Sequence, residues 1–413
     1  MKRRSTFVFM AACAALALSA SVAIRAQAPQ SQGLAPTKYK DVQSLKDVSI
    51  DQFDLTMNYF SAALGWQCQN CHVRDQATGV IDFVKEKKEK TVAREMIELV
   101  RVVNGGDYGA KINCATCHQG HNEPVGLAAA TPYTAEQVAA MAAQEAARAA
   151  RAAGPGPGGA GPGGAGRPGG APGQPGAQPG GRGPQQQPPP PPPVEPIIEK
   201  YIAASGRQAV LDKLQSRIIT GTVVNRSNVS MPFTIEEKGN KFHKVVTDPK
   251  GAVSYGFDGK TAWSVVDSKL EDLDGFRLDQ GMRLNDLRRA ADFAKRYTNL
   301  QAGRPTRLPA RTPGGQPINV NLVQGDLSPT TQERLFFDTT SGLLLRRQVI
   351  SRAALNGALV ETIDYSDYKD VGGVQVAFTI KHTTWNTVDT YTVVDVKTGA
   401  QIDDAKFSKP TGK

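Results

Sequence analysis

The chain has 413 residues and a formal net charge of +10, and 40% of its residues are hydrophobic and 21% charged. This length predicts two or three domains, and this composition excludes a chain that is disordered throughout. Beyond the N-terminus no apolar run reaches the ~20 residues of a membrane-spanning helix, which excludes a polytopic membrane protein.

The first 28 residues predict an export signal. Basic residues occupy positions 2–4, an apolar run covers 7–23, and the sequence AQA at 26–28 is typical of a cleavage site. This segment holds four basic residues and no acidic one, so its removal lowers the net charge from +10 to +6. We therefore expect a periplasmic protein. Membrane association, through a retained signal or lipidation of Cys13, stays open. No dense basic patch is present, and we expect no nucleic-acid partner.

Residues 34–133 predict a small, mainly helical module. Apolar side chains recur at helical spacing in two segments, Asp51–Gly65 and Val84–Asn104, which predicts one apolar face on each helix. A loop and then a cysteine cluster follow each helix, so the module reads as an internal pseudo-repeat. The face residues are Phe53, Met57, Phe60 and Leu64 on the first helix and Val92, Met96, Leu99 and Val103 on the second.

The two cysteine clusters are both Cys-x-x-Cys-His. Two thiols at this spacing can form thioethers with the vinyl groups of one haem, and the adjacent histidine then lies under the iron as its proximal ligand. Structural zinc, redox-active Cys-x-x-Cys pairs and structural disulfides are the alternatives. The expected thioether residues are Cys68, Cys71, Cys114 and Cys117, and the expected proximal ligands are His72 and His118.

One methionine precedes each motif. Met57 lies 11 residues before Cys68, and Met96 lies 18 residues before Cys114. A methionine on an apolar helix face is often ordinary core filling. Because each motif has one such methionine, we expect Met57 and Met96 to be the distal iron ligands. His/Met ligation closes the iron to small ligands, which favours electron transfer over catalysis.

Residues 34–126 resemble the cytochrome c subunit of photosynthetic reaction centres. The similarity lies in Met57 followed by ALG at 63–65 and CQNCH, and in KTVAREM at 90–96 followed by CATCHQG. The resemblance implies His/Met-ligated c-type haems. That subunit carries four haem motifs and lacks a counterpart of the C-terminal half, whereas this chain has two motifs.

Residues 134–153 form an Ala-rich segment that predicts a helix. Residues 154–193 contain 15 Gly and 14 Pro in 40 positions and end in six prolines, which predicts a disordered or polyproline II linker. We expect this linker to separate two domains.

Residues 194–413 predict a β-rich domain. Two helical patterns at 195–204 and 208–215 are followed by many β-branched runs, with one further helix expected at 283–297. The segments FDGKTAW, FFDTTSGLLLRRQ and DYSDYKDVGGVQVAF resemble, more weakly, the half-barrel of periplasmic lipoprotein carriers. This resemblance implies an antiparallel half-barrel with a cavity for an apolar ligand or lipid, and a β-sandwich is the alternative fold.

The whole chain is therefore expected to be of the α+β multidomain class, with a helical dihaem module, a linker and an antiparallel β domain. Its expected function is single-electron transfer between redox partner proteins, among them a membrane-bound electron-transfer complex or a reaction centre, and it is not expected to be an enzyme. A dihaem peroxidase and a lipid or apolar-ligand carrier with accessory haem are the alternatives.

Overall fold

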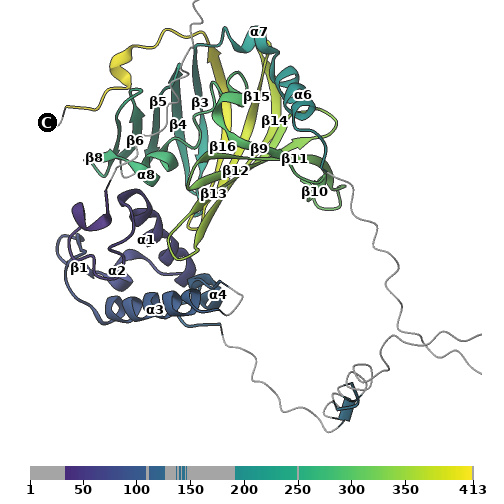
Figure 1. Cartoon of the computed structure of the whole chain (residues 1–413). Helices are drawn as coiled ribbons and strands as arrows, with labels where there is room; N and C mark the ends of the chain where they lie inside the picture. The colour runs from purple at the N-terminus through teal and green to yellow at the C-terminus, as the bar shows by residue number, and fades with distance from the viewer. Residues whose placement is uncertain are drawn as a thin grey trace, which may run out of the picture. The chain divides into compact units, whose positions relative to one another are not determined.

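The computed structural model in Figure 1 describes residues 33–107, 111–125, 136, 139–140, 142–144, 146, 191–248 and 251–411. The predicted signal at 1–28 and the linker up to residue 190 lie outside the described residues. Within 134–153 the described residues are helical and exposed. The chain divides into two compact units, of which one combines residues 1–123 with 191–413 and the other covers 124–190.

The helices of the larger unit fall into two groups along the chain. The N-terminal group has η1 (Ala35–Thr37), α1 (Ile50–Leu64), α2 (Cys68–Cys71), α3 (Lys88–Gly105) and α4 (Cys114–His118). The C-terminal group has α6 (Glu195–Ser205), α7 (Gln208–Leu211), α8 (Gly275–Gly281), α9 (Phe293–Arg296) and η2 (Asp404–Lys406).

Helix α1 begins and ends at residues suited to those positions. The Ser49 hydroxyl accepts a hydrogen bond from the Gln52 N–H, which caps the first turn. Gly65 ends the helix in the left-handed conformation, with φ of 63°. The expected helix at 51–65 is therefore present, but its deepest apolar face differs: Leu55, Tyr59 and Ala63 are its most buried apolar residues, while the predicted face is half-buried.

Helix α3 starts at Lys88 rather than at the expected Val84. The Asp82 carboxylate accepts the N–H groups of Val84 and Lys85, and this local turn replaces the first helical turn. On α3 the buried apolar residues are Ile97 and Val100. The expected face of Val92, Met96 and Leu99 is exposed instead.

Two short strands, β1 (Val73–Arg74) and β2 (Ile81–Asp82), form an antiparallel pair after the first cysteine motif. The remaining described strands form one antiparallel sheet of 14 strands. They are β3 (Ser216–Val224), β4 (Ser230–Lys238), β5 (Lys241–Asp248), β6 (Gly251–Phe257), β7 (Ala262–Val266), β8 (Lys269–Leu273), β9 (Thr298–Ala302), β10 (Thr306–Leu308), β11 (Ile318–Ser328), β12 (Thr331–Asp338), β13 (Leu344–Arg352), β14 (Ala358–Val371), β15 (Val374–Thr383) and β16 (Val388–Thr398).

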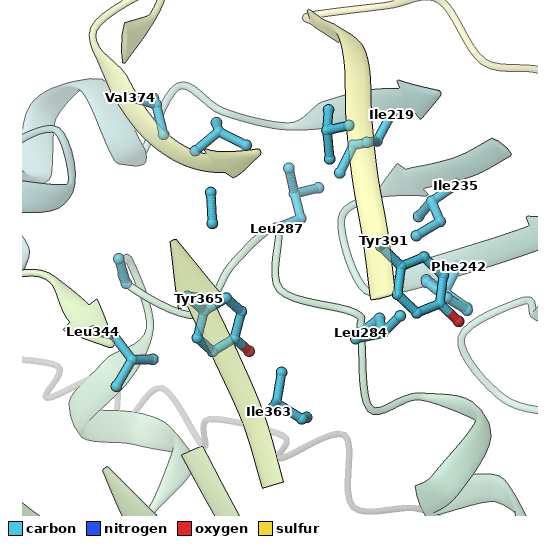
Figure 2. Packing of buried hydrophobic residues seen from close by; sticks show 14 of the residues in the cluster. Ile219, Ile235, Phe242, Leu284, Leu287, Leu344, Ile363, Tyr365, Val374 and Tyr391 are labelled. Carbon is cyan, nitrogen blue, oxygen red and sulfur yellow. The ribbon is translucent and has the colours of Figure 1, made fainter. Parts of the chain in front are cut away.

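The sheet follows the chain in meanders, with the order β10-β11-β12-β13-β14-β15-β16-β3-β4-β5-β6-β7-β8 and with β9 on β11. Figure 1 shows that it is a single curved sheet, so the expected half-barrel is confirmed and the sandwich alternative was wrong. Alternating burial along β4 and β13 places one set of side chains on the inner face. Figure 2 shows that inner core, where Ile363, Tyr365 and Tyr391 meet Leu284 and Leu287.

The expected helix at 283–297 is present only as α9 and is otherwise a series of turns. The reason lies in its backbone contacts, because the Glu237 carboxylate accepts the N–H groups of Asp286 and Leu287 at 3.0 Å each. Those donors are therefore drawn to β4 rather than to a helical carbonyl. The segment lies in the concavity of the sheet, where Arg289 pairs with Glu333 on β12 at 3.1 Å.

Candidate functional site

The first Cys-x-x-Cys-His motif forms a single helical turn. The Gln67 N–H donates to the Asn70 side chain at 3.0 Å, and the His72 N–H donates to the Cys68 carbonyl at 2.9 Å. Lys87 holds the end of this turn, since its ammonium donates to the Gln69 and Asn70 carbonyls. The turn brings both thiols and the histidine onto one short segment, as the spacing predicts.

His72 is half-buried against Phe83. The two ring centroids lie 4.9 Å apart in an edge-to-face arrangement, and the His72 Nδ1 is buried without a hydrogen-bond partner. Burial lowers the pKa of His72. The neutral imidazole that results is the form that binds a metal ion.

The second motif forms helix α4. The Asn113 side chain accepts from the Thr116 N–H at 3.2 Å and caps the turn. His118 Nδ1 lies 3.0 Å from the His121 carbonyl oxygen, which only accepts, so Nδ1 carries the proton. The Nε2 lone pair of His118 is then available to a metal, as in the usual arrangement of ligand histidines. His121 thus contributes to the site through its backbone carbonyl.

The four cysteines are free thiols. Burial raises the pKa of Cys71, and it raises the pKa of Cys114 to about 11. Redox-active Cys-x-x-Cys pairs depend on a lowered thiol pKa. The surroundings of Cys71 and Cys114 therefore do not favour that alternative. Among the described residues no three His, Cys, Asp or Glu side chains gather as a metal-binding group.

The two candidate distal methionines differ in exposure. Met57 on α1 packs against the cluster of Leu45, Val48 and Ile97. Met96 on α3 is 40% exposed. The structure therefore places Met57 in a core and Met96 on a surface, and their role as ligands stays a prediction.

The surface near the motifs is unusually apolar for a solvent-facing helix. Val92, Met96 and Leu99 form a stripe along α3 and are between 40% and 51% exposed. Phe83, whose ring contacts His72, is 55% exposed. These partly exposed apolar side chains are ones that a large apolar group could cover. The residues thus fit a large apolar group such as haem, which needs flat apolar walls beside a thioether anchor and a histidine.

The end of α1 is held against the residues that follow the second motif. The Gly120 N–H donates to the Ala63 carbonyl at 2.8 Å, and a Cβ on Gly65 would overlap the Gly120 carbonyl oxygen. Gly65 lies three residues before Cys68, and Gly120 lies two residues after His118. The two motifs are therefore fixed to each other through the backbone.

An ion-pair cluster of Lys90, Arg94, Asp41 and Glu86 supports the loop beside the first motif. Lys90 donates to the Asp41 carboxylate at 2.5 Å and to the carbonyls of Phe83 and Val84 at 2.9 and 3.2 Å. Arg94 pairs with Asp41 and Glu86 at 3.0 and 2.9 Å. Lys90 and Arg94 thus fix the loop that carries Phe83 beside His72. The sequence analysis placed Lys90 and Arg94 only in the KTVAREM pattern of the resemblance, and no sequence pattern predicted a role for Asp41.

The two histidines of the β domain lie in strand-like runs with no partner nearby in sequence, which predicts a structural role for both. His243 lies 2.8 Å from Glu236, and His382 lies 3.0 Å from Glu361. They are structural, but each has a carboxylate partner on a neighbouring strand, which no local pattern reveals.

The geometry of the N-terminal region agrees with a comparison to known families. Residues 11–153 match the family described as photosynthetic reaction centre cytochrome C subunit. The match spans both motifs and both methionine-bearing helices, which confirms the resemblance and supports a cytochrome-like role for this part of the chain. No curated protein matches the chain.

Solved structures similar to the chain share its β domain. A putative outer membrane lipoprotein-sorting protein domain from Vibrio parahaemolyticus is 12% identical over 51% of this chain and 97% of its own, with a TM-score of 0.37. A DUF1329 family protein from Desulfovibrio piger is 9% identical over 52% and 97%, with a TM-score of 0.38. A LolA superfamily protein from Nitrosomonas europaea is 16% identical over 52% and 97%, with a TM-score of 0.34. At these TM-scores the likenesses carry no argument about function.

Proposed function

We propose that this protein is an exported dihaem c-type cytochrome that transfers single electrons between redox partners. The observation that carries the proposal is the paired geometry of the motifs: the two cysteines of each motif lie on one helical turn, His72 follows directly after the first turn and His118 ends the second, and the His118 Nδ1 proton is held by the His121 carbonyl. The family match over residues 11–153 implies covalently bound haem and supports the same conclusion.

Each motif would bind one haem, with its cysteines as the covalent attachment and its histidine as an iron ligand. Cys68 and Cys71 would form the thioethers of the first haem, with His72 as its proximal ligand. A bound haem supplies an iron that changes oxidation state by one electron. The Phe83 ring, which lies edge-to-face on His72, would form one apolar wall of the first site.

The second site would use Cys114, Cys117 and His118, with the His121 carbonyl fixing the imidazole. Met57 and Met96 would be the distal ligands of the first and second haem. With both axial positions filled by protein, the irons would exchange electrons and not bind substrates. This favours a carrier over a peroxidase.

Redox partner proteins follow from single-electron transfer, and the family match points to a membrane-bound complex such as a reaction centre. Among the described residues no helix is long and apolar enough to cross a membrane. Export through the predicted signal at 1–28 would place the chain in the periplasm, where this type of haem attachment occurs.

The β domain holds a cavity of about 100 Å³, lined by residues including Tyr201, Leu287, Tyr365 and Tyr391. Small-molecule sites usually measure ~300–1,000 Å³. Carriage of an acyl chain would therefore require the segment at 275–297 to leave the concavity. We propose the apolar-ligand function only in that conditional form.

The first test is intact mass and an optical spectrum of the full chain produced with the c-type haem maturation machinery. We expect the mass of two covalent haems and the weak red band of a Met–iron(III) bond. The variants C68S/C71S and C114S/C117S should each lose one haem.

Each double variant serves as the matched control for the other. If the wild type carried no covalent haem, the proposed function would be wrong, and a zinc site or disulfides would be the remaining roles of the cysteines. Two haems with one high-spin iron would instead support the peroxidase alternative.

A further inference from the structure

The tip of the β13–β14 hairpin, residues 353–357, lies against the helices that carry the second cysteine motif. Figure 1 shows the long β13–β14 hairpin, and α1 contacts both of its strands. The backbone N–H of Ala354 donates to the Thr56 hydroxyl of α1 at 3.1 Å. Thr56 is fully buried, so this bond is shielded from water.

The hairpin tip also reaches the second motif directly. The Asn113 side-chain amide donates to the Asn356 carbonyl at 3.0 Å, while its oxygen caps α4. One side chain thus ties the start of the Cys114–His118 helix to the β domain.

Tyr59 forms a second link between the hairpin and the motif. Its hydroxyl accepts a hydrogen bond from the backbone N–H of Ala115 at 3.0 Å. Its ring lies so close to Gly357 that a Cβ there would stand 2.5 Å from the ring carbon Cε1. Cys114 itself packs against the cluster that contains Tyr59 and, from the β domain, Ala353 and Leu359.

The turn at the tip has a backbone conformation that Asn356 adopts readily but Leu355 disfavours. Leu355 and Asn356 both have φ of 57°, the left-handed region that glycine prefers. Leu355 packs against the cluster of Leu45, Val48 and Ile97, the same cluster that holds Met57. A bulky residue persists in this conformation when its contacts outweigh the strain. The contact of Leu355 with the helical module therefore stabilises this strained turn.

We propose that the hairpin tip is a positioning element for the second haem motif, so that the β domain sets the solvent access and reduction potential of that haem. The proposal rests on the dihaem function above. The loop beside the first motif has a separate support in Lys90, Arg94 and Asp41, and the hairpin tip reaches the first site only through the contact of Leu355 with the cluster that holds Met57.

The test compares two turns of the same backbone type in the full-length holoprotein. Leu355→Gly relieves the left-handed strain and removes the side chain that docks on the helices. Asp267→Gly is the control, because Asp267 and Ser268 have φ of 50° and 62° in the exposed β7–β8 turn. Both variants should fold, since glycine suits both turns.

The readouts are the haem count by intact mass, the two reduction potentials by spectroscopic titration, and the red Met–iron band. For L355G we expect two covalent haems, a clearly lowered second potential with a weaker red band, and a smaller change of the first potential, because Leu355 also packs on the cluster that holds Met57. D267G should match the wild type in every readout.

Tyr59→Phe provides an independent variant, because it keeps the ring and removes the acceptor of the Ala115 N–H. It should lower the second potential and leave the first unchanged, because the Tyr59 hydroxyl bonds only the second motif. If both variants keep wild-type potentials and the full red band, the positioning role is wrong while the dihaem function stands. Absence of covalent haem in the wild type would remove the proposed function itself.

Discussion

Gly65 and Gly120 lie back to back, with no space for a side chain on Gly65. A Cβ on Gly65 would overlap the Gly120 carbonyl oxygen, and Gly65 also has φ of 63°. The contact joins the residue that leads into the first cysteine motif to the residue that follows the second one. The relative position of the two motifs therefore depends on a backbone contact that only glycine permits.

Gly65→Ala should separate the two motifs and destabilise the helical module by about 1–3 kcal/mol, because it adds both a clash and left-handed strain. The measurement is denaturant unfolding of the full chain followed by circular dichroism. Gly105→Ala is the matched control, since nothing lies within 4 Å of a Cβ at that site and it should be neutral or slightly stabilising. Equal stability of the two variants would contradict the back-to-back contact.

Alanine variants of Met57 and Met96 should distinguish a packing role, measured by the free energy of unfolding, from a ligand role, measured by the red Met–iron band. Met57→Ala opens the cluster of Leu45, Val48 and Ile97 and should lower the free energy of unfolding of the haem-free protein by about 2 kcal/mol. Met96→Ala, at a site 40% exposed, should change it by less than about 0.5 kcal/mol. In the holoprotein each variant should remove about half of the red Met–iron band. An unchanged band in M96A would make Met96 an ordinary surface residue.

Lys90→Met should loosen the loop beside His72. The substitution removes one partner of Asp41 and the donor to the Phe83 and Val84 carbonyls. Because Asp41 is only partly buried and keeps Arg94 as a partner, we expect a loss of about 1–2 kcal/mol. Lys90 also lowers the pKa of Asp41 to about 2, which K90M should raise toward its ordinary value. Thermal unfolding gives the first quantity and NMR titration the second. Lys88→Met, on the exposed side of the same turn, is the control and should leave both unchanged.

The stability of the β domain should fall in acid through its buried carboxylates. Burial raises the pKa of Glu333, but Arg347 and Arg289 outweigh it and lower that pKa to about 2, from an ordinary value of 4.5. In the same way, Arg283 outweighs the effect of burial and lowers the pKa of Glu361 to about 2. A depressed carboxyl pKa contributes stability that is present above pH 4.5 and is lost as the pH falls toward 2.

Glu333→Gln tests this dependence. The variant should be less stable at neutral pH, because Arg289 and Arg347 lose their shared partner, and its free energy of unfolding should fall less steeply between pH 4.5 and 2 than that of the wild type. Unfolding in urea at several pH values measures both effects. An unchanged slope in E333Q would mean that other groups control the acid sensitivity.

Local sequence patterns were enough for most of the secondary structure and for the chemistry of the motifs. The spacing of Cys68, Cys71 and His72 places three functional groups on one turn whatever surrounds them, because the helical rise is the same everywhere. The β-branched runs from 216 onward became strands in chain order, since sequential antiparallel strands need only short turns.

Contacts between distant segments were beyond such patterns. The expected helix at 283–297 gave way to turns because Glu237, about 50 residues away, accepts two of its backbone donors. The deep face of α1 turned toward Leu359 and Ala353, so Leu55, Tyr59 and Ala63 are more buried than the predicted stripe.

The sequence by itself determined which residues can carry the proposed chemistry, since the Cys-x-x-Cys spacing and an adjacent histidine are properties of a few consecutive residues. Only the tertiary structure decided what holds that chemistry in place. Asn113 and Asn356 are 243 positions apart, and their hydrogen bond joins the second motif to the β domain. Such a contact depends on where the folded sheet directs its β13–β14 hairpin, which no local spacing encodes.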